Sequence, residues 1–178
     1  ISNADDAATI TIAYAPLSGT VAAANDGKAD ALTVGLNDVG TVNDPSTTAN
    51  EEKVVKIISE GIETLNVVSN GTANVAAFKN TTNVTTKEIN ISGAADLKVT
   101  EIDTTVTSVD ASTATGDLNL DLTTATIASV TTGSGDDTVT MTKMDVDATI
   151  AGGEGADTLV LTGAVTGTIQ PGLTGFET

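Results

Sequence analysis

Residues 152–160 read GGEGADTLV, and residues 132–140 read TGSGDDTVT. The two segments share glycines, an aspartate and a following aliphatic residue in the same order. Glycine permits a tight turn with positive φ and leaves backbone carbonyl groups uncovered, and the aspartate adds a carboxylate. The aliphatic residue can then anchor the turn to a hydrophobic core. Two such turns at this spacing are typical of stacked coils.

Apolar residues around these turns recur in three ladders, each with a step of about 21 residues. The first ladder contains Val75, Leu97, Leu118, Val139 and Leu159. The second contains Ala77, Val99, Leu120, Met141 and Leu161, and the third contains Val67, Ile89, Val109, Val130 and Ile150. One coil cannot bury its apolar face alone, whereas several stacked coils can.

The ladders predict an all-β fold, a right-handed parallel β-helix or β-roll solenoid with coils of about 21 residues. The handedness follows from the preference of crossover connections between parallel strands. Abundant Val, Ile and Thr favour strands, and the near absence of aromatic residues favours a thin core. An antiparallel sandwich also has strands every ~8–12 residues, but it does not require a constant step in three ladders.

The composition excludes several classes of function. The 178 residues include 24 acids, seven basic residues that are all lysine, and neither histidine nor cysteine, and the net charge is −17. A zinc site of histidines and cysteines, a cysteine nucleophile and disulfides are therefore excluded. The charge repels nucleic acid and anionic lipid, and no apolar stretch reaches the ~18 residues that span a bilayer. We expect no nucleic-acid partner and no membrane insertion.

The sequence divides into three parts. Residues 1–60 are expected to form strands, a loop and a short capping helix over EEKVVKIISE at 51–60, with acids in its first turn and Gly61 as its stop. Residues 61–174 are expected to form the regular solenoid, and residues 175–178 to begin a following module. The chain starts at Ile1 without a methionine or a signal-peptide pattern, so we expect it to be part of a longer protein.

Stacked glycine turns place carbonyl and carboxylate oxygens around one cavity, which is the environment of about six to eight oxygens that calcium prefers. Residues 117–157 contain eight acids and one lysine, and the stacked carboxylates of Asp137 and Asp157 would repel each other unless a cation neutralised them. We therefore expect Ca²⁺ as the cofactor. The upstream turn at Asp117 is a further candidate, although it lacks the paired glycines and its aspartate could instead cap a turn or face solvent.

Residues 152–160 resemble the calcium-binding nonapeptide of the repeats-in-toxin (RTX) family, and residues 132–140 resemble it with threonine in place of the first glycine. The resemblance implies a metal site that is shared by two successive turns. Its candidate ligands are Gly133, Gly135 and Asp137 in one turn and Gly152, Gly153, Gly155 and Asp157 in the next, with Asp117 one coil earlier. Each coil carries one motif where the family has tandem motifs, so the number of ions and the choice between a flattened β-roll and a rounder β-helix stay open.

A second resemblance concerns the segments GIETLNV at 61–67 and GFET at 175–178, which open the expected solenoid and close the chain. They are similar to the start of β-solenoid modules in bacterial surface-layer (S-layer) proteins of the RTX type, as is the run from Asp96 to Asp117. The resemblance implies type I secretion, folding in external calcium and self-association into a lattice at the extracellular cell surface. Cell-surface polysaccharide or lipopolysaccharide is a further candidate partner.

We expect no enzyme activity. Acid pairs such as Asp136/Asp137 and Asp145/Asp147 could act as acid and base, but the sequence offers no histidine to activate its many hydroxyl groups. Two alternatives to an S-layer module are a calcium-binding repeat of a large RTX adhesin and the secretion-assisting β-roll of an exported enzyme. An adhesin should expose an aromatic or Asn-rich stripe on one face, and the sequence reveals no such stripe.

Overall fold

The structure, a computed structural model, describes residues 9–13, 30–40, 52–82, 84–163 and 172–177. Within these ranges, fourteen strands form two seven-stranded sheets. Sheet A contains β2 (Ala31–Asn37), β4 (Thr64–Asn70), β6 (Glu88–Gly93), β8 (Ser108–Ala114), β10 (Ser129–Thr131), β12 (Thr149–Ala151) and β14 (Leu173–Thr174). Sheet B contains β1 (Thr9–Ala13), β3 (Val55–Glu60), β5 (Ala73–Phe78), β7 (Asp96–Ile102), β9 (Leu118–Asp121), β11 (Thr138–Met141) and β13 (Thr158–Leu161).

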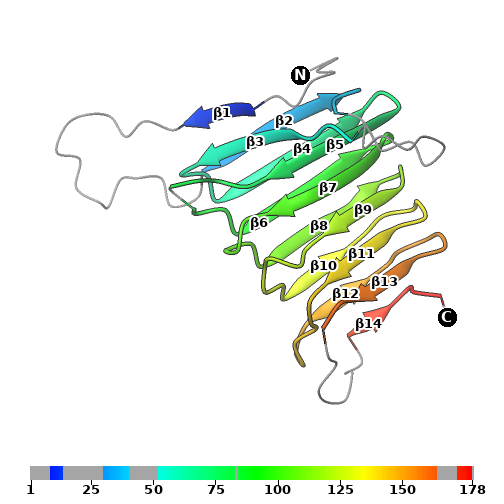
Figure 1. The fold of residues 1–178 in the computed structure, drawn as a ribbon. Helices are drawn as coiled ribbons and strands as arrows, with labels where there is room; N and C mark the ends of the chain where they lie inside the picture. The colour runs from blue at the N-terminus through cyan, green and yellow to red at the C-terminus, as the bar shows by residue number, and fades with distance from the viewer. Residues whose placement is uncertain (1–8, 14–29, 41–51, 83, 164–171, 178) are drawn as a thin grey trace.

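The chain alternates between the two sheets, and each strand pairs in parallel with the strand two places along the chain (Figure 1). This arrangement is a parallel β-solenoid of about five turns. Ile89, Val109, Val130 and Ile150 are direct partners on successive strands of sheet A. The predicted coil length of about 21 residues is confirmed. No strand pair in the described residues is antiparallel.

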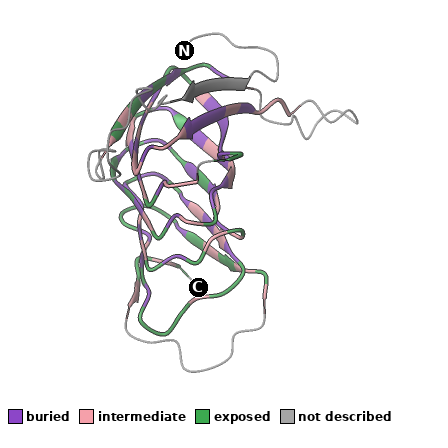
Figure 2. Cartoon of the chain, turned by 90° about the vertical axis from the view of Figure 1, so that its left-hand side faces the viewer, coloured by how far each residue is buried: buried purple, intermediate pink, exposed green. Residues whose placement is uncertain are grey.

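A thin aliphatic core lies between the sheets. Buried and exposed residues alternate along the strands (Figure 2). Along β9, Leu118 and Leu120 are buried while Asn119 is exposed, as the alternation of the sequence predicts. Two inward columns run along the solenoid. They consist of Leu65, Ile89, Val109, Val130 and Ile150 from sheet A, and Ala76, Val99, Leu120, Val139 and Leu159 from sheet B.

The predicted ladders are correct in part. Ile89 to Ile150 align as predicted, but Leu65, not Val67, lies level with Ile89. In sheet B, Val139 lies beside Leu120 and not beside Leu118, so this step is shorter than the one before it. The turn before β11 places Asp137 at the level of Leu118, where the predicted ladder had Val139. Strand β11 is therefore shifted by two positions relative to the prediction.

The predicted capping helix over 51–60 is wrong, because Val55–Glu60 is strand β3 and no described residue is helical. β3 lies between β1 and β5, with Ile57 beside both Ile10 and Phe78. Val55 and Ile57 are fully buried, and both are β-branched residues that fit a strand better than a helix. Tertiary packing therefore overrides the helical spacing and the acids in the first turn.

The solenoid extends across the expected boundary at residue 61, since β2 pairs with β4 along its whole length and β3 pairs with β5. The two similar tetrapeptides do not occupy equivalent places. Residues 61–63 precede a strand of sheet A, whereas residues 175–177 follow one. The described residues include no helix that is long and apolar enough to cross a membrane.

Candidate functional site

The predicted glycine turns lie directly above one another. Residues 132–137 connect β10 to β11, and residues 152–157 connect β12 to β13. The backbone N–H of Glu154 donates to the carbonyl of Gly133 at 2.9 Å, and that of Asp137 donates to Oδ1 of Asp157 at 2.8 Å. The seven predicted ligands in these two turns therefore meet at one edge, which we call the A-to-B edge because sheet A strands lead into sheet B strands there. Asp117, the eighth, lies at the same edge one coil earlier.

Glycine is required where these turns touch. Gly153 has φ +91°, and a Cβ built on it would lie 2.1 Å from the carbonyl oxygen of Gly133. A Cβ on Gly133 would lie 1.9 Å from the carbonyl oxygen of Ala114, in the coil before. The turns thus stack backbone against backbone, which leaves no room for a side chain between them.

Asp137, Asp157 and Glu177 form an inner carboxylate column at the A-to-B edge. Each carboxylate accepts a backbone N–H from the preceding coil: Asp137 from Leu118 at 2.8 Å, Asp157 from Asp137 at 2.8 Å, and Glu177 from Asp157 at 2.5 Å. Asp137 and Asp157 are buried at positions where earlier coils carry leucines. Glu177 was not predicted, although it follows Asp157 by the same step that separates Asp137 from Asp157.

Asp96, Asp117 and Asp136 form an outer carboxylate column, and it points the other way along the solenoid. Each Oδ1 accepts a backbone N–H from the following coil. Asp96 accepts from Asp117 at 3.0 Å, Asp117 accepts from Asp136 at 2.9 Å, and Asp136 accepts from Ala156 at 2.9 Å. Asp117 therefore lies in this column and is not level with Asp137. Its carboxylate satisfies a backbone donor between coils, the turn-capping role that the sequence left open.

The inner column holds negative charge in a poorly solvated place. Burial raises the pKa of Asp137 and of Asp157 above the ordinary aspartate value, and the backbone N–H groups that they accept only partly oppose this effect. The neighbouring charges of Glu177 and Asp136 raise the pKa of Asp157 further. A bound cation would relieve this repulsion.

One oxygen of the column lacks a partner. Asp137 uses both oxygens, since its Oδ2 accepts the N–H of Gly133 at 3.2 Å. Asp157 is 2% exposed, and its Oδ2 is the one buried side-chain oxygen or nitrogen without a hydrogen bond in the described part of the chain. A buried carboxylate oxygen without a donor is costly, so this atom is the position where a ligand is most needed.

The atoms around Asp157 Oδ2 fit calcium chemistry. A Cβ on Gly152 would lie 2.6 Å from Asp157 Oδ2 and 2.1 Å from the carbonyl oxygen of Gly175, so both oxygens face the same side of Gly152. Carboxylate and carbonyl oxygens are the hard ligands that calcium takes. No three acidic side chains of the described residues are arranged to hold a metal among themselves, so an ion here would need carbonyl groups and water as well.

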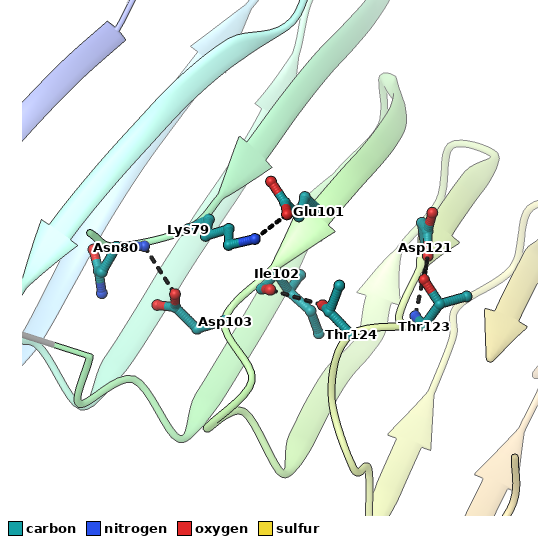
Figure 3. A network of polar contacts seen from close by, with 8 residues as sticks. All are labelled: Lys79, Asn80, Glu101, Ile102, Asp103, Asp121, Thr123 and Thr124. Atoms are coloured by element: carbon teal, nitrogen blue, oxygen red, sulfur yellow. Dashed lines mark hydrogen bonds and ion pairs between the residues drawn. The ribbon is translucent and has the colours of Figure 1, made fainter. Parts of the chain in front are cut away.

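The opposite edge carries a smaller polar column that the sequence did not reveal (Figure 3). Ser59 N–H donates to Asn80 Oδ1 at 2.6 Å, and Asn80 N–H donates to Asp103 Oδ1 at 2.8 Å. Burial raises the pKa of Asp103, while the Asn80 N–H and the charge of Lys79 act in the opposite direction. The spacing of Asn80 and Asp103 along the chain is the sequence feature that could have revealed this column. The spacing is longer than the steps of the apolar ladders, so the two residues did not stand out as a repeat.

Asp103 predicts a pH dependence of stability. Its folded pKa lies above its unfolded pKa, so its contribution is fully present below the unfolded value of about 4 and is lost as the pH rises through the raised folded value. We expect Asp103→Asn to raise the melting temperature at pH 7 in EDTA and to have little effect near pH 3.5. Thermal melts at both pH values test this.

Asp110→Asn is the matched control with the opposite sign, because the Ser112 N–H holds the pKa of Asp110 low. That variant should lose stability at pH 7 and match the parent at low pH. An equal loss at both pH values for Asp103→Asn would contradict the role assigned to burial.

Sheet A presents a polar stripe on its outer face. Thr33, Asn66, Asn90 and Asp110 lie in register on successive strands. Asn90 Nδ2 donates to Asn66 Oδ1 at 3.0 Å, and Asn66 Nδ2 donates to Thr33 Oγ1 at 3.5 Å. A register shift between β6 and β8 lies beside a groove of about 300 Å³ that includes Ser92. The stripe contains two half-buried asparagines, which the sequence did not place together because they are far apart along the chain.

Comparisons with protein-family models, with curated proteins and with solved structures gave no match for this chain.

Proposed function

We propose that this chain is a calcium-stabilised structural module of a secreted bacterial surface-layer protein. The observation that carries the proposal is the buried, unpartnered Oδ2 of Asp157 in a column of stacked carboxylates. Asp157 Oδ2 and the carbonyl of Gly175 would hold the ion, and the charges of Asp137 and Glu177 would add to its attraction. The ion would supply the positive charge that the column lacks.

The mechanism is folding linked to ion binding. Without calcium, the repulsion among the inner carboxylates weakens the stacking of the 132–137 and 152–157 turns. Calcium binds the stacked turns and not the unfolded chain, so it adds stability by mass action. Upstream, the equivalent positions carry Leu97 and Leu118, which need no ion. The winding is right-handed in this proposal, as crossovers between parallel strands almost always are.

The assembly part of the proposal rests on the RTX-type resemblance and on the shape of the module. A solenoid of two stacked parallel sheets can act as a rigid building unit, and its net negative charge resists nonspecific association. We propose type I secretion, self-association into a lattice outside the cell, and anchoring through surface polysaccharide or lipopolysaccharide. No catalytic role is assigned.

Calcium titration of Asp157→Asn tests the site. At a calcium concentration about 100 times Kd, the parent chain should gain about 2.7 kcal/mol of stability. Asparagine keeps an oxygen for the Asp137 N–H but removes the charge at the unpartnered position. We expect Asp157→Asn to be at least as stable as the parent in EDTA and to lose most of the calcium gain, with affinity lower by about tenfold or more.

Asp110→Asn removes the same charge on the outer face of sheet A and should leave the calcium gain unchanged. Calorimetric titration and thermal melts provide the two measurements. Equal calcium affinity in Asp157→Asn and the parent would exclude the proposed site.

A repeat module of an adhesin is the second candidate, and the polar stripe of Thr33, Asn66, Asn90 and Asp110 favours it. The groove beside the stripe offers amide and hydroxyl groups of the kind that bind sugar hydroxyls. Electron microscopy of the calcium-loaded full-length protein distinguishes the candidates, because a two-dimensional lattice is expected only for the surface-layer protein.

A further inference from the structure

Three turns at the A-to-B edge end in an inward polar side chain, and they differ in how that side chain is satisfied. Asn74, Asp137 and Asp157 each accept a backbone N–H from the preceding coil and are at most 2% exposed. Asn74 lies beside Leu97, and Leu97 lies beside Leu118, whose N–H Asp137 accepts, so the three belong to one column. The remaining polar atoms of these buried side chains need partners in their own turn or in the following coil.

Asn74 finds its partners through a serine five positions earlier. Its Nδ2 donates to the hydroxyl of Ser69 at 2.8 Å and to the carbonyl of Asn70 at 2.9 Å. Ser69 Oγ in turn donates to the carbonyl of Asp96 in the following coil at 3.4 Å. A hydroxyl group therefore satisfies the inward side chain and joins it to the next coil.

Thr132 occupies the same place before Asp137. Its hydroxyl donates to the carbonyl of Gly152 in the following coil and lies within hydrogen-bonding reach of the Asp137 carboxylate. Burial raises the pKa of Asp137, and the Thr132 hydroxyl is one of the groups that oppose this effect. Asp137 Oδ2 also accepts the N–H of Gly133 at 3.2 Å. Groups of the chain itself therefore complete this turn.

Gly152 occupies this place before Asp157, so this turn has no hydroxyl there. Asp157 Oδ2 has no hydrogen-bond partner in the described part of the chain, and only the N–H of Asp137 opposes the burial that raises the pKa of Asp157. The absent side chain lets two oxygens approach one point, since a Cβ on Gly152 would lie 2.6 Å from Asp157 Oδ2 and 2.1 Å from the carbonyl oxygen of Gly175. Oxygens this close together can share one calcium ion, because calcium–oxygen bonds are about 2.3–2.6 Å long.

We infer that calcium binds where Gly152 takes the place of a hydroxyl-bearing residue. Asp157 and the carbonyl of Gly175 hold the ion, so the site lies between these two coils and not between the two turns that the RTX resemblance implies. The hydroxyls of Ser69 and Thr132 close the equivalent places in earlier coils. This inference rests on the proposed calcium site and specifies which neighbouring coils share it.

Asp137→Asn and Asp157→Asn are the matched pair that tests the placement. Asn74 shows that this column accommodates an asparagine whose Nδ2 donates to a hydroxyl, and Thr132 offers such a hydroxyl at position 137. We expect Asp157→Asn to lose most of the calcium-induced rise in melting temperature and Asp137→Asn to keep most of it. Thermal melts of the 178-residue chain in EDTA and in calcium chloride measure both.

The outcomes separate this inference from the proposed function. An equal or larger loss in Asp137→Asn would mean that both turns bind the ion, which would overturn the inference and leave a calcium site at this edge. An unchanged calcium response in both variants would exclude the proposed site and the inference with it. A loss confined to Asp157→Asn supports both.

Thr132→Gly and Thr132→Ser test the role of the hydroxyl. Serine keeps the hydroxyl, so Thr132→Ser should bind as many ions as the parent chain. Glycine reproduces the arrangement at Gly152 and frees its carbonyl, so calorimetric titration of Thr132→Gly should show one more calcium ion per chain. If Thr132→Gly is unfolded in EDTA, recovery of the β-sheet circular dichroism signal in calcium measures the same gain. Equal numbers of ions in the two variants, or no recovery, would overturn the inference.

Discussion

Replacing Leu120 by alanine is expected to lower the free energy of unfolding by about 2–5 kcal/mol. Leu120 is completely buried and lies between Val99 and Val139 in the inward column of sheet B. The core here is one or two side chains thick, so the surrounding strands cannot move inward to fill the gap without breaking their pairing. Urea unfolding followed by far-UV circular dichroism measures the loss.

Val146→Ala is the control, because Val146 is 57% exposed and its truncation should change stability by no more than about 0.5 kcal/mol. A loss below about 1 kcal/mol for Leu120→Ala would mean that the coils around β9 are not the packed centre of the solenoid. Such a result would also undermine the register described above.

Gly153→Ala is expected to cost about 2–4 kcal/mol and to disrupt the stacked turns. The added Cβ would lie 2.1 Å from the carbonyl oxygen of Gly133, and a φ of +91° is unfavourable for any residue with a side chain. The backbone must then shift, which separates Glu154 from Gly133 and Asp157 from Asp137. We expect a lower melting temperature and a loss of calcium response in the same variant.

Gly35→Ala provides the comparison within the same solenoid. Gly35 lies in β2, and a Cβ there would meet no atom within 4 Å. Alanine at this position should leave stability unchanged or raise it by up to about 1 kcal/mol, because it reduces the freedom of the unfolded chain. Equal losses in the two glycine variants would contradict the close stacking of the 132–137 and 152–157 turns.

The repeat in the sequence was sufficient to predict the fold class, because Ile89, Val109, Val130 and Ile150 occupy the same place in successive coils. The repeat did not predict the register correctly where the length of a turn changed, as before β11. Asp137 and Asp157 were expected to follow the turn, but they take inward positions that Leu118 occupies one coil earlier. A single sequence shows the spacing of these residues but not which side of the backbone they face.

The helix predicted over 51–60 failed for another reason. Its apolar residues have a spacing that suits one face of a helix, yet Val55 and Ile57 are both buried in a strand that has neighbours on either side. The choice of strand over helix was decided by pairing with β1 and β5, which are distant in the sequence. The same applies to the stripe of Asn66 and Asn90, whose members only become neighbours when the coils stack.

The two carboxylate columns have a mechanical consequence. Inner carboxylates reach back to the preceding coil and outer ones reach forward, so each turn from Asp117 to Asp157 is tied to both neighbours. In these same coils, threonine hydroxyls connect the opposite edge. Thr124 and Thr142, for example, each donate a hydroxyl hydrogen bond to a carbonyl of the preceding coil. Hydrogen bonds to carboxylates are the stronger kind. Once a cation neutralises the inner carboxylates, a rod pulled along its length would therefore separate first on the threonine side and bend towards its acidic side.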